Sequence, residues 1–114
     1  MSMMIPFQTT NWETIPSTEH KGETGIAIWK TLQYDKIRVR LIEYSENYKA
    51  DHWCSKGHII YCLEGEFISH LKDGREYLLT TGMSYQTTDD NENPHMSTSK
   101  YGCKLFVVDG DFLK

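Results

Sequence analysis

Long apolar runs and clusters of positive charge are both missing from this chain of 114 residues, whose formal net charge is −4. Without a basic patch, the sequence gives no sign of nucleic-acid binding. Its apolar runs span only a few residues, whereas a membrane-spanning helix needs about 20. The segment Met1 to Phe7 lacks the positive and apolar parts of a signal peptide. We therefore expect neither nucleic acid nor a membrane as partner.

Cysteine is scarce, and its spacing argues against disulfide bonds. The chain has three cysteines, an odd number, and none of them forms a Cys-x-x-Cys pair. A disulfide framework is therefore not expected, and a reducing, cytoplasmic setting is predicted. Repeats, low-complexity linkers and convincing amphipathic helices are also missing, and the length suits one domain.

Segments rich in strand-forming residues recur about every ten residues, with turn signals between them. We expect strands at 25–32, 36–44, 58–63, 66–72, 76–80, 82–87, 95–99 and 103–108. Asp73-Gly74 predicts a tight hairpin, and Glu64-Gly65 a turn. This pattern predicts an all-β, antiparallel sandwich or barrel. The barrel is expected to span residues 25–114, with residues 1–24 as an irregular segment packed on it.

The segment 36–44 alternates between apolar and basic residues. Ile37, Val39 and Leu41 share one face of the expected strand, and Arg38 shares the other with Arg40. We expect the arginines to lie on a solvated face. The alternative is that they hold an anion inside a pocket.

The stretch from Asp51 to His58 carries the strongest chemical signal in the sequence. His52 and Cys54 are two residues apart, so their side chains leave the same face of an extended strand. His58 follows after a predicted turn, and His95 lies downstream behind a proline. A convergent set of imidazoles and a thiolate is what a transition-metal site requires. We predict that His52, Cys54, His58 and His95 are metal ligands.

The remaining histidines and cysteines have simpler interpretations. His20 and His70 are expected to be ordinary surface or hydrogen-bonded residues. Cys62 lies about 13 Å along the strand from His58, too far to share an ion with it, and is expected to be a small buried hydrophobe. Cys103 is expected in the core or at a sheet edge.

The spacing of the candidate ligands resembles the first motif of the cupins, G-x5-H-x-H-x3-4-E-x6-G. His52, Cys54, His58 and Gly65 keep that spacing. Cys54 stands where the family has its second histidine, His58 stands where it has a glutamate, and Glu46 replaces the leading glycine.

The second cupin motif, G-x5-P-x-G-x2-H-x3-N, is matched only in part. Gly82 fits its first glycine, but His95 comes two residues late, Pro-x-Gly is absent and Ser99 replaces the asparagine. The resemblance covers roughly residues 36–109. The segment Ala50–His58 is more closely similar to a group of single-domain cupins with an Asp/His/Cys/Trp signature, for which no function is established.

The resemblance implies a small jelly-roll β-barrel with a metal ion near one mouth, and often a homodimer. A homodimer also fits the outward parity predicted for Trp53, Tyr61 and Leu63, because exposed apolar patches often mark interfaces.

Three imidazoles and a thiolate favour zinc, with nickel or copper possible and iron less favoured.

Three classes of function stay open. The protein could be a metal-dependent enzyme acting on a small polar molecule, or a metal-dependent module that binds such a molecule without turnover. It could also be a metal-free cupin that binds a small ligand or has a structural role. Catalysis is left undecided, because His58 occupies the position of the family's glutamate.

Overall fold

The computed structural model describes residues 5–114, and strands dominate it. A single 3-10 turn, η1 (Trp12–Thr14), precedes nine strands. The strands are β1 (Ser17–Lys21), β2 (Ile26–Tyr34), β3 (Ile37–Tyr44), β4 (Tyr48–Lys49), β5 (His58–Leu71), β6 (Glu76–Thr80), β7 (Ser84–Thr87), β8 (His95–Ser99) and β9 (Cys103–Gly110). In this part of the chain, no helix is long and apolar enough to cross a membrane. The prediction of an all-β domain is confirmed.

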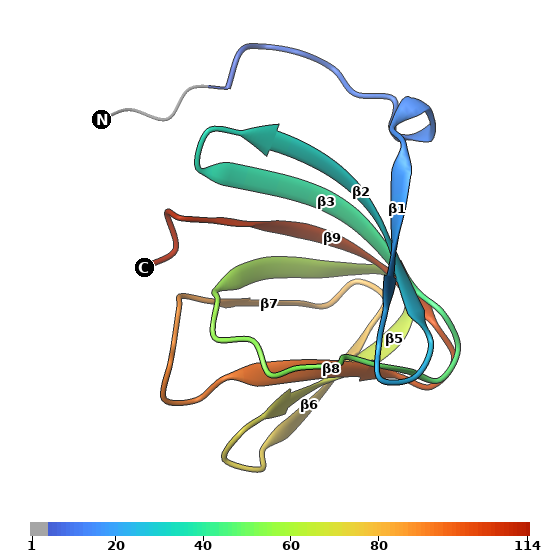
Figure 1. The fold of residues 1–114 in the computed structure, drawn as a ribbon, viewed down its shortest axis with the longest axis vertical. Coiled ribbons are helices and arrows are strands. Elements are labelled where there is room, and N and C mark those ends of the chain that lie inside the picture. Colours follow the sequence, from blue (N-terminus) through green and yellow to red (C-terminus); the bar gives the residue numbers. More distant parts are fainter. Residues whose placement is uncertain (1–4) are drawn as a thin grey trace.

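All the strands pair antiparallel, in the order β1-β2-β3-β9-β5-β8-β4, and β6 and β7 also pair with β5. The first half of β5 pairs with β9 and β7, whereas its second half pairs with β6 and β8. The long strand β5 therefore belongs to both layers of the curled sheet, and Figure 1 shows β2, β3 and β9 in one layer and β8 and β6 in the other.

The turn expected at Glu64-Gly65 is instead an irregularity inside β5. The register with β9 shifts between Cys62 and Glu64, and the strand continues to Leu71. Gly65 has a φ of 81°, which glycine adopts without steric cost. A bulge and a turn need the same backbone freedom, so the sequence signal does not separate them.

The expected irregular N-terminal segment contains one strand. Residues 17–21 form β1 and pair with β2 at the edge of the sheet. Apart from η1, residues 5–16 form no regular element. The expectation for residues 1–4 lies outside the described residues.

The apolar core lies between the two layers. Its buried members are Ala27, Ile42, Ile60, Cys62, Phe67, Leu79, Cys103, Leu105 and Val107. The burial of Cys62 and Cys103 agrees with the sequence interpretation. On β5, alternate residues from His58 to Cys62 face this core, while Ile59 and Tyr61 remain exposed. The strand parity therefore places His58 inside.

The predicted orientation of β3 is wrong for its arginines. Arg40 is only 4% exposed, and both Arg38 and Arg40 line an internal cavity with Ile42. The alternation correctly indicates two faces, but it cannot tell which face is inside. Asp109 on the neighbouring strand decides this, because it supplies a buried carboxylate to which both guanidinium groups bind.

We predict that Leu105→Ala lowers the free energy of unfolding by about 2–5 kcal/mol, because it opens a cavity at a fully buried position. Leu78→Ala is the matched control, since Leu78 is 51% exposed, and it should cost less than about 1 kcal/mol. Urea unfolding of both variants measures the difference, and equal losses would contradict the assignment of the core.

Candidate metal centre

The buried charged and imidazole side chains, Arg40, His58, His95 and Asp109, gather at one end of the barrel. Here β5 begins at His58, β9 approaches its end at Asp109 and β8 begins at His95. A cavity of about 170 Å³ opens at this end. Its lining includes Trp29, Arg38, Arg40, Tyr44, Tyr48, His52, Cys54, His58, Tyr85 and His95, together with apolar residues of the core.

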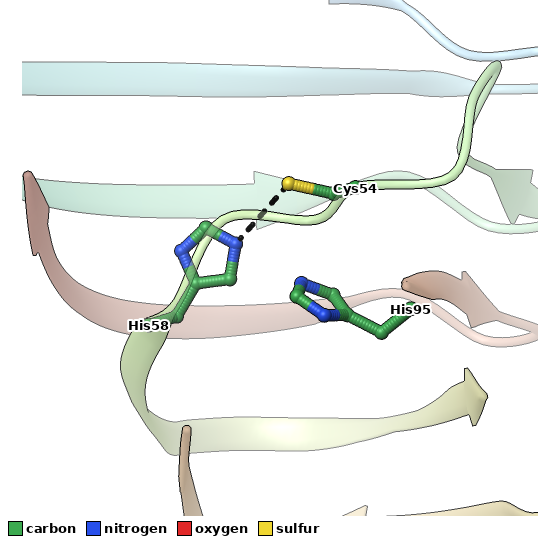
Figure 2. A group of neighbouring side chains, drawn as sticks. All are labelled: Cys54, His58 and His95. Atoms are coloured by element: carbon green, nitrogen blue, oxygen red, sulfur yellow. Dashed lines mark hydrogen bonds between the residues drawn. The ribbon is translucent and has the colours of Figure 1, made fainter. Parts of the chain in front are cut away.

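Three of the four predicted ligands lie together in this cavity. One ligand atom from each of Cys54, His58 and His95 lies within 4.8 Å of the others. The Sγ atom of Cys54 is 3.7 Å from Nε2 of His58. Figure 2 shows the three side chains reaching into a common space from β5, β8 and the loop that precedes β5. The two residues buried most deeply are the histidines.

Backbone contacts hold Cys54 in place although it lies in a loop. Its amide donates to the carbonyl of His95 at 2.7 Å, and the amide of His95 donates back to the carbonyl of Cys54 at 2.9 Å. Nearby, the amide of Gly57 donates to the Asp89 carboxylate at 2.7 Å. The cysteine and one histidine therefore keep a defined separation without depending on their side chains.

The three residues fit a tetrahedral metal ion. Bonds of about 2.0–2.3 Å place the donors of such an ion roughly 3.5 Å apart, close to the observed distance between Cys54 and His58. Nε2 of His95 is buried and has no hydrogen-bond partner within the described chain. A buried donor or acceptor without a partner is costly unless something binds it, so this nitrogen is suited to ligation.

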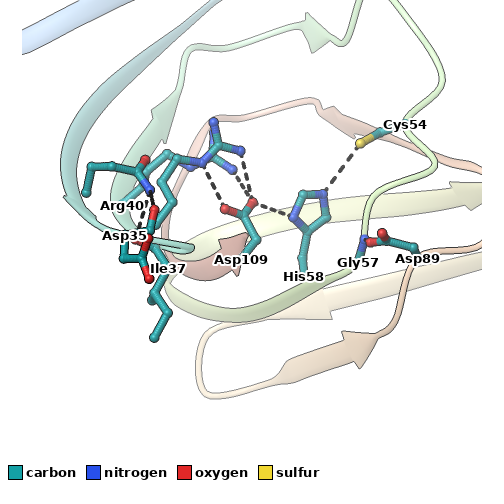
Figure 3. Close-up of polar contacts among 10 residues, drawn as sticks. Asp35, Ile37, Arg40, Cys54, Gly57, His58, Asp89 and Asp109 are labelled. Atoms are coloured by element: carbon teal, nitrogen blue, oxygen red, sulfur yellow. Dashed lines mark hydrogen bonds and ion pairs between the residues drawn. The ribbon is translucent and has the colours of Figure 1, made fainter. Parts of the chain in front are cut away.

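A carboxylate behind His58 orients its ring. Nδ1 of His58 is 2.7 Å from Oδ2 of Asp109, which leaves Nε2 facing Cys54, as Figure 3 shows. Asp109 also binds Arg38 through two hydrogen bonds and Arg40 through one. Histidine ligands of metals commonly make such a contact through their other nitrogen, because it fixes the tautomer and the ring orientation.

The same network shifts the ionisation of its members. Burial raises the pKa of the Cys54 thiol, but the hydrogen bond with His58 and the nearby imidazole of His95 outweigh it and bring that pKa to about 5. Burial lowers the pKa of His58, but its contacts with Asp109 and Cys54 outweigh this and raise it. For Asp109, hydrogen bonds from His58 and Arg38 overcome burial and hold the pKa well below its usual value. Cys54 is therefore suited to act as a thiolate at neutral pH.

His52, the fourth predicted ligand, is not brought to the other three. The extended strand expected around it is absent, because residues 51 and 52 form a bend. Its side chain is 72% exposed, and Nδ1 lies 2.6 Å from the Asp51 carboxylate. It nevertheless lines the cavity, so its role as a ligand stays a prediction.

Asp109 was missed by the sequence interpretation, although a signal for it exists. Alternate residues of β9 are buried from Cys103 through Leu105 and Val107 to Asp109. Strand parity thus places one acid on an otherwise apolar inner face. An acid at such a position needs a buried cationic partner, and Arg38 is its register partner on β3.

We predict that Asp109→Asn lowers the free energy of unfolding by about 3–5 kcal/mol at pH 7, because it leaves a buried guanidinium without its partner. Since the pKa of Asp109 is lower in the folded state, its stabilising contribution is present above the unfolded value of about 3.9 and is lost as the pH falls through the folded value. The variant should therefore lose less stability on acidification than the parent.

Urea titrations between about pH 2 and 7 measure both effects. Asp73→Asn is the control, because the Asp73–Arg75 pair is exposed and such pairs contribute about 0–1 kcal/mol. If the free energy of unfolding of Asp109→Asn fell as steeply at acid pH as that of the parent, the role of this carboxylate would be contradicted.

No family model matches the chain, and no curated protein matches its sequence. Its fold, in contrast, matches many solved structures. An RmlC-like cupin from Shewanella frigidimarina is 19% identical with a TM-score of 0.70, and the match covers 96% of this chain and 94% of that one. Ectoine synthase from P. lautus is 16% identical with a TM-score of 0.73, covering 91% and 78%.

A third similar structure, Fe(II)-HppE with an alternative substrate, is 15% identical with a TM-score of 0.73. That match covers 95% of this chain and 62% of the other. These identities are low, whereas the similarity extends over nearly the whole chain and includes a protein described as a cupin. The resemblance inferred from the sequence is confirmed at the level of fold: this protein is a small cupin-type β-barrel.

Proposed function

We propose that this protein holds a divalent transition metal, zinc in the first place, through Cys54, His58 and His95, and binds a small polar molecule beside it in the barrel mouth. The observation that carries this proposal is the convergence of one thiol and two imidazoles in a cavity. His58 and His95 begin different strands and both are buried, so the cluster is not a chance grouping of exposed side chains.

The donor types support the choice of metal. Thiolate and imidazole together favour zinc, with nickel and copper as further candidates. Iron is a further candidate, because the similar HppE structure is described as an Fe(II) form. Three protein ligands leave a position open, which is typical of zinc sites that exchange water or substrate. His52 lines the cavity and is the residue that could contribute a fourth ligand.

A bound metal would act as a Lewis acid toward an oxygen of the ligand. The chain itself supplies the surroundings. Asp109 keeps His58 in the orientation that presents Nε2 to the cavity. Core residues close the inner end of the cavity, and the loop containing Cys54 borders it. These features suit binding of a small molecule away from bulk water.

A metal-free thiol site is the second candidate. Asp109, His58 and Cys54 form a continuous chain of contacts, 2.7 Å and 3.7 Å long. A thiol beside an imidazole that a carboxylate orients is also the arrangement of an activated cysteine nucleophile. Since metal ligation and nucleophilic attack require the same sulfur atom, protection of Cys54 by metal separates the two candidates.

We also propose a reducing compartment such as the cytoplasm, because all three cysteines are free. The cysteine that contributes to the site would otherwise be open to oxidation.

We predict that zinc protects Cys54 from alkylation. In metal-free protein the thiol should react readily, because its pKa of about 5 leaves it ionised at pH 7. Zinc should slow the reaction at least about tenfold, since a coordinated thiolate is shielded. Mass mapping after iodoacetamide treatment measures this, with Cys62 and Cys103 as internal controls because both are buried. Equal rates with and without saturating zinc would favour the metal-free thiol site.

We predict that His58→Ala and His95→Ala each weaken zinc binding at least about tenfold, whereas His20→Ala and His70→Ala leave it nearly unchanged. His20 stacks on Trp29 and His70 contacts Thr98, so neither belongs to the cluster. Competition with a chelator measures the affinities. The same assay on His52→Ala tests the fourth predicted ligand.

Zinc affinity should also fall as the pH drops below about 7. The ligands bind the metal only when deprotonated, and the pKa of His58 is raised above the ordinary value of about 6.5. Protons therefore compete with zinc at a higher pH than they would at an unperturbed imidazole. The chelator assay repeated between pH 5 and 8 measures the profile, and a flat profile would argue against histidine ligation.

We further propose a homodimer. The outer face of β5 exposes Ile59, Tyr61 and Leu63, each more than 40% accessible, and Trp53 is exposed nearby in sequence. Contiguous apolar surface of this kind is commonly covered by a partner. Light scattering should give a dimer at tens of micromolar, and Tyr61→Lys should shift it toward monomer. A monomeric parent protein would contradict this proposal.

A further inference from the structure

The wall of the cavity opposite the cysteine loop is cationic. Arg38 and Arg40 line it, and Asp109 is the carboxylate they share. Two guanidinium charges against one carboxylate leave a formal charge of +1. Among the described residues, no aspartate or glutamate lines the cavity. Cys54 and His58 do not cancel this charge. They are either both neutral, or a thiolate beside an imidazolium with no net charge, so the interior keeps one positive charge in excess.

Arg40 has a hydrogen-bond donor that the protein does not use. Its side chain is 5% exposed, and one terminal nitrogen binds Asp109 at 2.7 Å. Nε of Arg40 is buried and has no partner within the described chain. A buried guanidinium donor without an acceptor is costly. An acceptor from outside the protein would therefore be favoured at this position.

The guanidinium is also held rigidly. Its central carbon lies 4.3 Å from the ring centroid of Trp29, a cation–π distance. Asp109 fixes one end of the group, and Trp29 covers it. A planar donor that is already oriented loses little conformational freedom on binding, so it suits recognition of a carboxylate.

The same cavity has a second polar group without a hydrogen-bond partner and an apolar wall. The hydroxyl of Tyr85 is buried without a partner in the described residues, and Ile42, Ile60 and Val107 complete the wall. Because a cavity of about 150 Å³ accommodates benzene, the 170 Å³ observed suits a molecule of about six to nine non-hydrogen atoms. A short alkyl or aryl chain could contact the apolar wall.

We propose that the small molecule bound in this cavity is a carboxylate, with its anionic group on Arg40 and its short apolar part against Ile42, Ile60 and Val107. This rests on the proposed function in that both place the ligand beside Cys54, His58 and His95. Arg40 is not one of the proposed metal ligands, so its interaction with an anion can be measured with or without metal.

The experiment titrates butyrate into protein without metal and into zinc-loaded protein, and follows the Nε–H resonances of the arginines by ¹⁵N NMR. The chain has only three arginines, so assignment is direct. Butyrate should shift the Arg40 resonance with a dissociation constant of about 1 mM or tighter. Butyramide, a neutral molecule of the same size, should bind at least about tenfold more weakly. Equal shifts with butyramide, or no shift at Arg40, would overturn the proposal.

Variants separate the arginine from general charge effects. Arg40→Met should weaken butyrate binding at least about tenfold in both forms. Arg75→Gln is the matched control, because Arg75 is exposed and pairs with Asp73, and it should leave binding unchanged. If Arg40→Met does not fold, Arg40→Lys retains the charge but lacks the planar donors, and it should bind butyrate more weakly than the parent. Parent-like affinity in the folded variants would overturn the proposal.

Failure of this inference can be distinguished from failure of the proposed function. Zinc that binds while butyrate does not would remove the carboxylate site and leave the metal site in place. Butyrate that binds while zinc does not would support the carboxylate site and remove the metal site. Inorganic phosphate that binds through Arg40 while butyrate does not would overturn the choice of a carboxylate.

Discussion

One buried carboxylate organises the open end of this barrel. Asp109 is 2% exposed, and it accepts hydrogen bonds from Arg38 and Arg40 and contacts His58. Transfer of any one of these charged groups from water into the interior would be strongly unfavourable by itself. The network permits Arg40 to be buried and the half-buried Arg38 to line the cavity, and it sets the direction in which His58 presents its second nitrogen. The cation-lined cavity and the cysteine–histidine cluster both depend on it.

The backbone of β5 connects this polar end with the apolar core. The strand begins at His58, contributes Ile60 and Cys62 to the buried interior and continues past Gly65 into the second layer. Because β5 pairs with four other strands, its register is set on both sides. A histidine at the start of such a strand is therefore held on a rigid framework, as metal sites and binding sites require.

The site combines rigid and looser parts. His58 and His95 begin two strands, whereas Cys54 belongs to a loop that is tied to β8 by a pair of backbone hydrogen bonds. His52 lies two residues earlier, where the chain bends and the imidazole is exposed. This difference in backbone pairing explains why Cys54 and His52, only two residues apart, have different surroundings. Backbone pairing holds the cysteine at the cavity, and the described structure shows no comparable restraint for the histidine.

The sequence by itself determined the all-β character, most strand positions and the Asp73-Gly74 hairpin, because these follow from local alternation and turn chemistry. It also identified Cys54, His58 and His95 as candidates through their residue types and spacing. Local patterns did not reveal that β5 is continuous, because glycine serves bulges and turns alike.

Only the tertiary structure decided which face of β3 is buried and which acid neutralises its arginines. Arg38 and Asp109 are 71 residues apart in the chain, and they meet because β3 and β9 pair in one register. The alternation of β3 fits both orientations equally well. The free energy that separates them comes from a long-range contact, in which a buried carboxylate compensates the desolvation of the Arg40 guanidinium and also pairs with Arg38.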